Sequence, residues 1–168
     1  MKLFTPFLIF FYMQMLSPEL FAQADSLQKQ INEQVWKVFI NSFNNSDNTG
    51  LSSVHSRELS RVSIDNNQII GYGEYFKPLP DSVNVMRSRW KSNIELRFLQ
   101  RIASNGRAFE TGYYKTTSTN STSGQSRTGY GKFVVLLRKE NGVWKILMDA
   151  DAHEKTNAEI FMSAKPME

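Results

Sequence analysis

Residues 129–153, GYGKFVVLLRKENGVWKILMDADAH, have the pattern of two strands joined by a tight turn. Apolar and polar side chains alternate on both sides of Asn141-Gly142, as they do in strands that bury one face. Asn-Gly is the strongest short hairpin signal, because both residues tolerate the positive φ angles of a type I′ turn. The stretch therefore predicts an antiparallel hairpin.

A second hairpin is predicted upstream of the first. The segments NIELRFLQRIAS (93–104) and RAFETGYYKTT (107–117) also have a period of two and are joined by Asn105-Gly106. A polar connector, STNSTSGQS, separates the two hairpins. The second half of the chain is therefore expected to be an antiparallel meander, with Arg101 and Glu110 forming a cross-strand ion pair near its rim.

The first half of the chain is mostly helical by the same criteria. Apolar side chains recur at every fourth position over residues 25–43, which predicts a long amphipathic helix. A short helix at 51–55, a strand at 58–65 and a second helix at 81–91 are expected to follow. Because helices gathered on one face of an antiparallel sheet define the α+β class, we expect an α+β fold.

The N-terminus has the features of a signal peptide. Lys2 precedes a short apolar run, LFTPFLIFFYMQML, and Ala22-Gln23-Ala24 matches the small-residue pattern of a cleavage site. The run is shorter than the roughly 20 residues that a membrane-spanning helix needs. We therefore expect cleavage after Ala24 and a single mature domain over residues 25–168. That product would be periplasmic or secreted, with no stable membrane anchor.

The composition excludes several classes of function. The chain has no cysteine, so disulfides, thiol catalysis and thiolate metal sites are ruled out. The formal net charge is +4, and the basic residues are scattered along the chain. Nucleic-acid-binding proteins normally carry a basic run or stripe instead. Neither a nucleic-acid partner nor a cofactor is therefore expected.

Two carboxylates and a histidine stand at every second position where the last predicted strand ends: Asp149, Asp151 and His153. Residues i, i+2 and i+4 of a strand share one face, so the three side chains would point the same way. The row is compatible with a solvated strand end, with the polar lining of a pocket, or with an acid–base site in which a carboxylate orients the imidazole. Three strand residues in a row seldom converge on one ion, so no metal site is expected.

Two-residue turns also predict which residues lie opposite one another. Across the last hairpin, one face becomes polar away from the turn, whereas the other stays apolar. The pairs expected on the polar face are Leu136–Leu147, Val134–Asp149, Lys132–Asp151 and Tyr130–His153. The second, apolar face suggests a homodimer interface through Phe133, Val135 and Met148.

The order of these elements resembles the nuclear transport factor 2-like superfamily, in particular its SnoaL-like and small bacterial members of unknown function. The resemblance rests on the long helix, SFNNSDNTGLSSVHS (42–56), IIGYGEYF (69–76), GRAFETGYY (106–114) and a last strand with Gly-x-Trp-Lys-Ile followed by aspartate. It implies a cone in which a curved sheet wraps the long helix and leaves a pocket open at one end. Members include ketosteroid isomerase, polyketide cyclases, dehydratases and epoxide hydrolases, together with binding modules that have no chemistry.

The resemblance implies that one face of the last strands lines the pocket, with Asp149, Asp151 and His153 as the candidate catalytic residues. Ketosteroid isomerase activity itself is not expected, because Phe39, Ser63 and Val134 stand where those isomerases carry a tyrosine and two acids. The residues expected around a ligand are Lys132, Tyr130, Val134, Leu147, Phe109, Thr111, Tyr113, Phe39, Phe43 and His55.

The function predicted from the sequence is an exported domain that binds a small, largely apolar molecule in a cone-shaped pocket. Cofactor-free acid/base chemistry of the isomerase, dehydratase or hydrolase type would suit such a site. A non-catalytic, homodimeric interaction or assembly module is the alternative, because the apolar outer face would serve it equally well.

Overall fold

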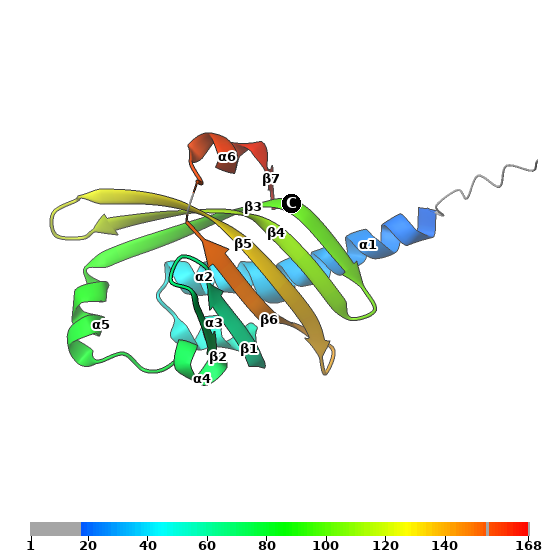
Figure 1. Ribbon diagram of the computed structural model, residues 1–168, viewed down its shortest axis with the longest axis horizontal. Coiled ribbons are helices and arrows are strands. Elements are labelled where there is room, and N and C mark those ends of the chain that lie inside the picture. The colour runs from blue at the N-terminus through cyan, green and yellow to red at the C-terminus, as the bar shows by residue number, and fades with distance from the viewer. Residues whose placement is uncertain (1–17, 154, 168) are drawn as a thin grey trace, which may run out of the picture.

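The computed structural model describes residues 18–153 and 155–167. Its centre is a curved seven-stranded sheet with the strand order β2-β1-β6-β5-β4-β3-β7 (Figure 1). All neighbouring strands are antiparallel except β1 and β6, which run parallel. The strands are β1 (His55–Ser63), β2 (Gln68–Gly71), β3 (Trp90–Ser104), β4 (Arg107–Asn120), β5 (Ser126–Glu140), β6 (Val143–Ala152) and β7 (Lys165–Pro166).

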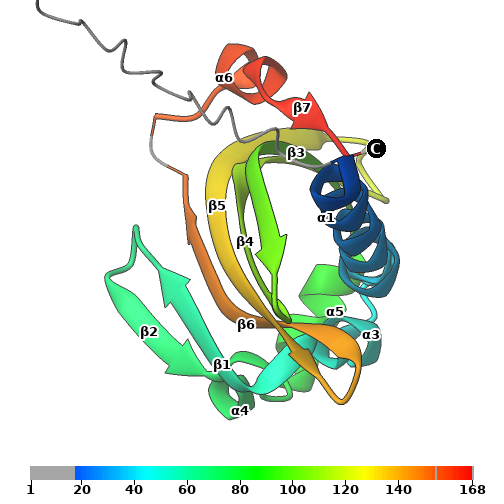
Figure 2. The ribbon, with the colours of Figure 1, turned by 90° about the vertical axis from the view of Figure 1, so that its right-hand side faces the viewer.

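The helices α1 (Pro18–Ile31), η1 (Asn32–Trp36) and α2 (Lys37–Asn44) follow one another without a break and form one long helix. Figure 2 shows that the sheet curves around this helix. Ile31, Val35 and Trp36 are buried and form the core with the inner side chains of the sheet. This arrangement confirms the predicted α+β cone. The remaining helices are α3 (Asn48–Ser53), α4 (Tyr72–Tyr75), α5 (Asp81–Ser88) and α6 (Ala158–Ser163).

The middle of the long helix is a π-helix, where the sequence predicted uninterrupted α-helix. Residues four apart lie on one face of such a helix, so Asn32 and Trp36 point the same way. Both contact the same buried ion pair. Trp36 Nε1 donates to Glu110 at 2.5 Å, and Arg101 donates to Glu110 at 2.9 Å and to Asn32 at 2.6 Å. Glu110 is 0% exposed, so this pair lies in the core and not at the rim.

Both Asn-Gly hairpins form as predicted, and all four turn residues have positive φ angles. Near the second turn the predicted register also holds, because Leu137 lies opposite Ile146. A β-bulge then inserts Leu147, so that Leu136 pairs with Met148. Beyond the bulge every pair is displaced by one residue from the prediction. A slip of one residue moves side chains to the opposite face.

The bulge overturns the predicted faces of β5. Phe133 lies opposite Asp151 and Val135 opposite Asp149, on the inner side of the sheet. Phe133 is 5% and Val135 2% exposed, so the prediction that they form an outer dimer face is wrong. Met148 pairs instead with Leu136, which is 40% exposed, on the outer side.

A second bulge, at Leu99, has the same effect on β3 and β4. Phe98 lies opposite Gly112, whereas an unbroken count from the Asn105-Gly106 turn would place it opposite Tyr113. The buried residues of β4 are accordingly Ala108, Glu110 and Tyr114 together with the intervening Gly112. The positions between them, Phe109, Thr111 and Tyr113, lie on the outer side of the sheet and not in its interior as expected.

The C-terminal segment, α6 and β7, packs beside β3. Phe161 is 3% exposed and lies against Tyr130, with a ring-centroid distance of 5.9 Å. Arg97 donates to the carbonyl oxygen of Ala164 at 3.0 Å, and β7 pairs with β3. Tyr130 therefore packs against this segment, and the predicted Tyr130–His153 pair does not form.

Most of the predicted signal peptide lies outside the described residues, and α1 continues through the expected cleavage position at Ala24. Within residues 18–153 and 155–167, no helix is long and apolar enough to cross a membrane.

Candidate functional site

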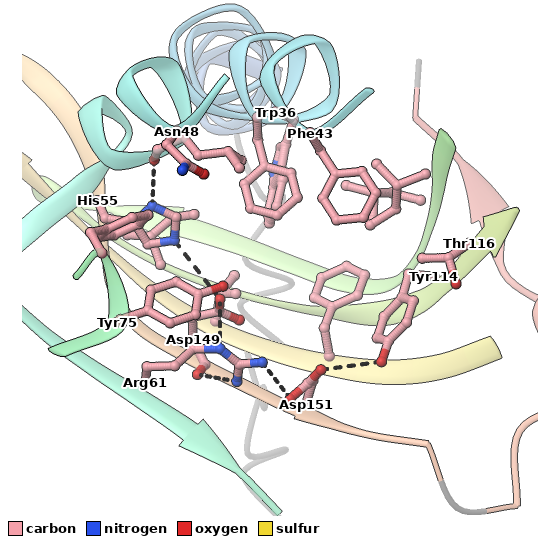
Figure 3. Close-up of a pocket in the computed structure, with 18 of the residues that line it drawn as sticks. Trp36, Phe43, Asn48, His55, Arg61, Tyr75, Tyr114, Thr116, Asp149 and Asp151 are labelled. Atoms are coloured by element: carbon pink, nitrogen blue, oxygen red, sulfur yellow. Dashed lines mark hydrogen bonds and ion pairs between the residues drawn. The ribbon is translucent and has the colours of Figure 1, made fainter. Parts of the chain in front are cut away.

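A cavity of about 390 Å³ lies between the long helix and the inner face of the sheet (Figure 3). We call it the inner pocket. Aromatic and aliphatic side chains form most of its wall, so a ligand here would be largely removed from water. These apolar residues are Trp36, Phe39, Phe43, Leu51, Phe76, Ile94, Leu96, Phe133, Val135 and Ile146. The polar residues are Asn48, His55, Arg61, Tyr75, Tyr114, Thr116, Asp149, Asp151 and His153.

His55 opens β1 and lies in the wall of the inner pocket, with its side chain 1% exposed. Its Nδ1 lies 2.7 Å from the carbonyl oxygen of Leu51, a contact that requires a proton on Nδ1. Nε2 then faces Asp149 Oδ2 at 3.8 Å, beyond hydrogen-bond range (Figure 3). Among the described residues, this buried Nε2 has no hydrogen-bond partner.

Arg61 joins the two aspartates of β6. Its Nη2 donates to Asp151 Oδ1 at 2.6 Å, whereas its Nε lies 3.6 Å from Asp149 Oδ2. Burial alone would lower the pKa of Arg61, but the charges of Asp149 and Asp151 and the hydrogen bond to Asp151 raise it above its ordinary value. The guanidinium is therefore a fixed cation. Its buried Nε, like His55 Nε2, has no hydrogen-bond partner among the described residues.

The rim of the pocket holds a second polar group around Tyr114. The Tyr114 hydroxyl lies 3.1 Å from Asp151 Oδ2 and 3.0 Å from His153 Nε2. On its other side, His153 Nδ1 contacts Asp65 Oδ2 at 2.7 Å. Burial and the charge of Asp151 raise the pKa of Tyr114, so the phenol stays protonated at neutral pH. The Tyr114 hydroxyl has one proton, which it can donate to Asp151. If Nε2 of His153 carries a proton, it can donate to the hydroxyl oxygen, so that both contacts are hydrogen bonds.

Glycines make room for two of these aromatic side chains. A Cβ atom at Gly131 would lie 2.3 Å from the ring of Tyr114, and one at Gly112 would lie 2.8 Å from the ring of Phe133. The absence of a side chain at these positions therefore lets both rings pack directly onto the neighbouring strands.

Tyr75 and Phe76 close the pocket beside His55. The His55 ring lies 6.0 Å from that of Tyr75 and 5.1 Å from that of Phe76. Burial of the phenol group and the charge of Asp149 raise the pKa of Tyr75. Tyr75 is thus a neutral group at physiological pH, and it places a proton donor near the carboxylates.

The sequence-predicted site residues divide into two groups. Asp149, Asp151, His153, Phe39, Phe43 and His55 all line the inner pocket. The others do not line it: Lys132, Tyr130, Val134, Leu147, Phe109, Thr111 and Tyr113. The bulge at Leu147 on β6 explains this for β4 and β5, whose mutual register is continuous. The positions that an unbroken count places on the face of Asp149 and Asp151 lie on the opposite face.

The sequence reasoning missed Trp36, Arg61, Tyr75 and Tyr114. Arg61 comes close to the aspartates only because β1 pairs in parallel with β6, where it lies opposite Asp149. A parallel pairing between distant segments leaves no turn signal in the sequence. Trp36 and Tyr114 are aromatic residues in amphipathic segments, a pattern that does not separate a pocket wall from a filled core.

No metal centre is evident in the part of the chain that the structure describes. There, no three histidine, cysteine, aspartate or glutamate side chains lie close enough together to hold a metal ion. The carboxylates of the inner pocket are instead paired with Arg61.

Comparison with known proteins identifies the fold. No protein-family model matches the chain, and no curated protein is similar to it in sequence. Solved structures do match. An NTF2-like protein with a cystatin-like fold from Novosphingobium aromaticivorans has a TM-score of 0.61 at 11% identity, covering 87% of this chain and 96% of that one. An NTF2-like protein of unknown function from Shewanella oneidensis has a TM-score of 0.58 at 18% identity, covering 74% and 98%.

A ketosteroid isomerase-like protein from Erwinia carotovora atroseptica has a TM-score of 0.57 at 15% identity, covering 75% of this chain and 95% of that one. At sequence identities this low, the similarity is evidence for a shared fold and for nothing more. The chain therefore has the nuclear transport factor 2-like fold, and the resemblance that its sequence suggested is confirmed at that level.

Proposed function

We propose that the inner pocket binds a small, largely apolar molecule that carries a hydroxyl or similar polar group. The observation that supports this most is that two buried nitrogens near Asp149, His55 Nε2 and Arg61 Nε, have no hydrogen-bond partner among the described residues. Burying a polar atom without a hydrogen bond costs about 1–3 kcal/mol. A ligand group that fills this gap would recover much of that free energy.

The three groups around the gap define the complementary ligand. The carboxylate of Asp149 accepts hydrogen bonds, and Arg61 Nε–H donates them. With its proton on Nδ1, neutral His55 presents Nε2 as a second acceptor. A hydroxyl group could therefore donate to Asp149 or His55 and accept from Arg61, while the aromatic wall receives the rest of the molecule.

The same geometry suits cofactor-free acid/base chemistry as an extension of binding. Asp149 is a carboxylate that lies close to the imidazole of His55 and the guanidinium of Arg61, and a carboxylate can accept a proton from a substrate. Tyr75 and His55 stand beside it as groups that can hold or return a proton. Isomerisation, dehydration and hydrolysis all need such a pair and no cofactor.

Ligand binding can be tested with 2-naphthol and naphthalene, which differ only in the hydroxyl group. Wild-type protein should bind 2-naphthol more tightly. Replacing His55 with alanine, or Asp149 with asparagine, should weaken 2-naphthol binding about 10- to 100-fold, the range expected for a charge-assisted hydrogen bond. Naphthalene binding should change little. Isothermal titration calorimetry measures all of these affinities.

Glu58→Gln is the matched control for the loss of a carboxylate, because Glu58 does not line the inner pocket and its side chain is 71% exposed. It should leave 2-naphthol affinity within a few-fold of wild type. Equal affinities for the two compounds in wild type, or an unchanged affinity in both inner variants, would contradict the proposal.

We also propose that the domain is exported, with cleavage after Ala24. Support comes from the sequence, in which a short apolar run precedes the small-residue pattern Ala22-Gln23-Ala24. N-terminal sequencing of protein recovered outside the cytoplasm should begin at Asp25. Recovery of the uncut chain from the cytoplasm would contradict export.

A homodimer through the outer face of the sheet remains part of the proposal, with different residues from those first expected. Leu136 and Met148 lie opposite each other there, and Ile102 on β3 is 52% exposed. Exposed apolar side chains on one sheet face favour association with a second copy of the chain.

A further inference from the structure

A second cavity, of about 790 Å³, continues from the inner pocket along the inside of β3, β4 and β5. Four residues line both cavities, so the two are joined: Phe43, Asn48, Leu51 and Thr116. In Figure 3, Thr116 lies on the other side of the pocket from His55 and Tyr75. A ligand with its polar group at His55 could therefore extend past Thr116 into this second cavity, which we call the hydroxyl groove.

The lining of the hydroxyl groove differs in kind from that of the inner pocket. Hydroxyl side chains dominate it, among them Ser92 and Ser118, whose oxygens lie 2.8 Å apart across β3 and β4. Figure 1 shows that these strands extend beyond the end of α2. The groove thus adds hydroxyl donors beside apolar side chains such as Phe43 and Trp90, which suits the end of a molecule where an apolar body meets a polar head group.

Arg127 is the charged residue in the lining of the groove, and no carboxylate accompanies it there. Its guanidinium carbon lies 4.6 Å from the centre of the Trp90 ring, a cation–π contact that holds it in place. Among the acidic residues that the structure describes, none forms an ion pair with Arg127. An oriented, unpaired guanidinium surrounded by hydroxyl donors is suited to an anion.

The two ends of the combined cavity therefore carry opposite charge. At the inner end, Asp149 and Asp151 outnumber the one guanidinium of Arg61. At the outer end, the one charge among the described lining residues is the positive charge of Arg127. An anionic group would be repelled from the first end and attracted to the second, which fixes the direction in which an elongated ligand lies.

From this asymmetry, and resting on the proposed function of the inner pocket, we infer that the natural ligand is an elongated amphiphile with an acidic head group. Its apolar body occupies the aromatic inner pocket. Its head group, a sulfate, phosphate or carboxylate, is held in the hydroxyl groove by Arg127.

Three probes with the same apolar chain test the head group: n-octyl sulfate, 1-octanol and n-octyl β-glucoside, each below its micelle concentration. Calorimetric titration of the wild-type protein should show n-octyl sulfate binding about tenfold more tightly than either neutral compound. Because a screened ion pair contributes less, that advantage should shrink as salt is added. Arg127→Gln should abolish the advantage and leave 1-octanol affinity unchanged.

Lys91→Gln is the matched control. Lys91 lies between the groove residues Trp90 and Ser92 on the same strand but does not line the groove. Its substitution therefore removes one positive charge close to the groove, as Arg127→Gln does. It should keep the sulfate advantage. An advantage that survives in Arg127→Gln, equal affinities for all three probes, or a preference for the glucoside would overturn the inference. If 1-octanol binds while the sulfate has no advantage, the head-group inference alone fails; if none of the three binds, the proposed function of the inner pocket fails with it.

Discussion

Replacing Glu110 with alanine is expected to lower the free energy of unfolding by about 3–5 kcal/mol, the range for removing one partner of a buried ion pair. Glu110 is 0% exposed and accepts hydrogen bonds from Trp36 Nε1 and Arg101 Nε. The substitution leaves an indole N–H and a guanidinium without this partner and opens a cavity between them. Urea denaturation followed by circular dichroism measures the loss.

Glu110→Gln is the control, because it keeps the volume and one acceptor oxygen for Trp36. It should cost less than alanine does. A loss below about 1 kcal/mol for Glu110→Ala, within the range of surface substitutions, would contradict the buried cluster.

The same residue predicts a pH dependence of stability. Burial raises the pKa of Glu110 above its ordinary value of 4.5, although Arg101 and Trp36 oppose that rise. The folded state therefore holds this proton more tightly than the unfolded state does. The contribution of Glu110 to stability is present below pH 4.5 and declines as the pH rises through the folded-state pKa. The stability of wild type relative to Glu110→Gln should fall over that interval.

Replacing Phe133 with alanine is expected to cost about 3–5 kcal/mol, as for other buried phenylalanines. Phe133 is 5% exposed, and its ring packs 5.6 Å from that of Trp36 and 5.5 Å from that of Phe98. Because the ring also lines the inner pocket, the substitution should weaken 2-naphthol binding as well. Thermal and urea denaturation measure the stability, and calorimetry measures the binding.

Leu136, three residues along the same strand and 40% exposed, is the matched comparison. Leu136→Ala should cost about 1 kcal/mol or less. Leu136→Glu should leave the domain folded but shift the proposed dimer toward monomer, which sedimentation velocity would detect. A larger loss of stability for Leu136→Ala than for Phe133→Ala would contradict the bulge at Leu147. It would mean that β5 and β6 pair in the register predicted from the turn.

The turns were the part of the fold that the sequence predicted best. Asn105-Gly106 and Asn141-Gly142 act locally, since the backbone geometry that they favour depends on two adjacent residues. The pairing they predict is correct as far as Leu137 and Ile146. The bulge at Leu147 lies just beyond, where no glycine, proline or polar residue marks it.

The candidate site was predicted in part for the same reason. Asp149, Asp151 and His153 do share the inner face, since they follow the bulge and keep their own period of two. Their neighbours across the sheet were predicted wrongly, because the bulge displaced β5 relative to them. Arg61, the group that joins both aspartates, comes from a strand whose parallel pairing depends on the tertiary fold.

The π turn shows a further limit of sequence patterns. Leu27, Ile31 and Val35 fit an α-helical repeat, and nothing in that repeat signals a change of period at Asn32. The π turn carries Asn32 and Trp36, which contact Arg101 and Glu110, residues about 70 positions away. Contacts between residues so far apart depend on the tertiary fold and leave no signal in the local sequence.

The central claim, that the inner pocket holds a largely apolar ligand with its polar group at Asp149, is tested most directly by a crystal structure of the mature domain with 2-naphthol. The account predicts the rings among Trp36, Phe39 and Phe133, with the hydroxyl oxygen within hydrogen-bond distance of Asp149 and Arg61. A ligand bound only outside this pocket, or a pocket filled by rearranged side chains of the protein, would contradict it.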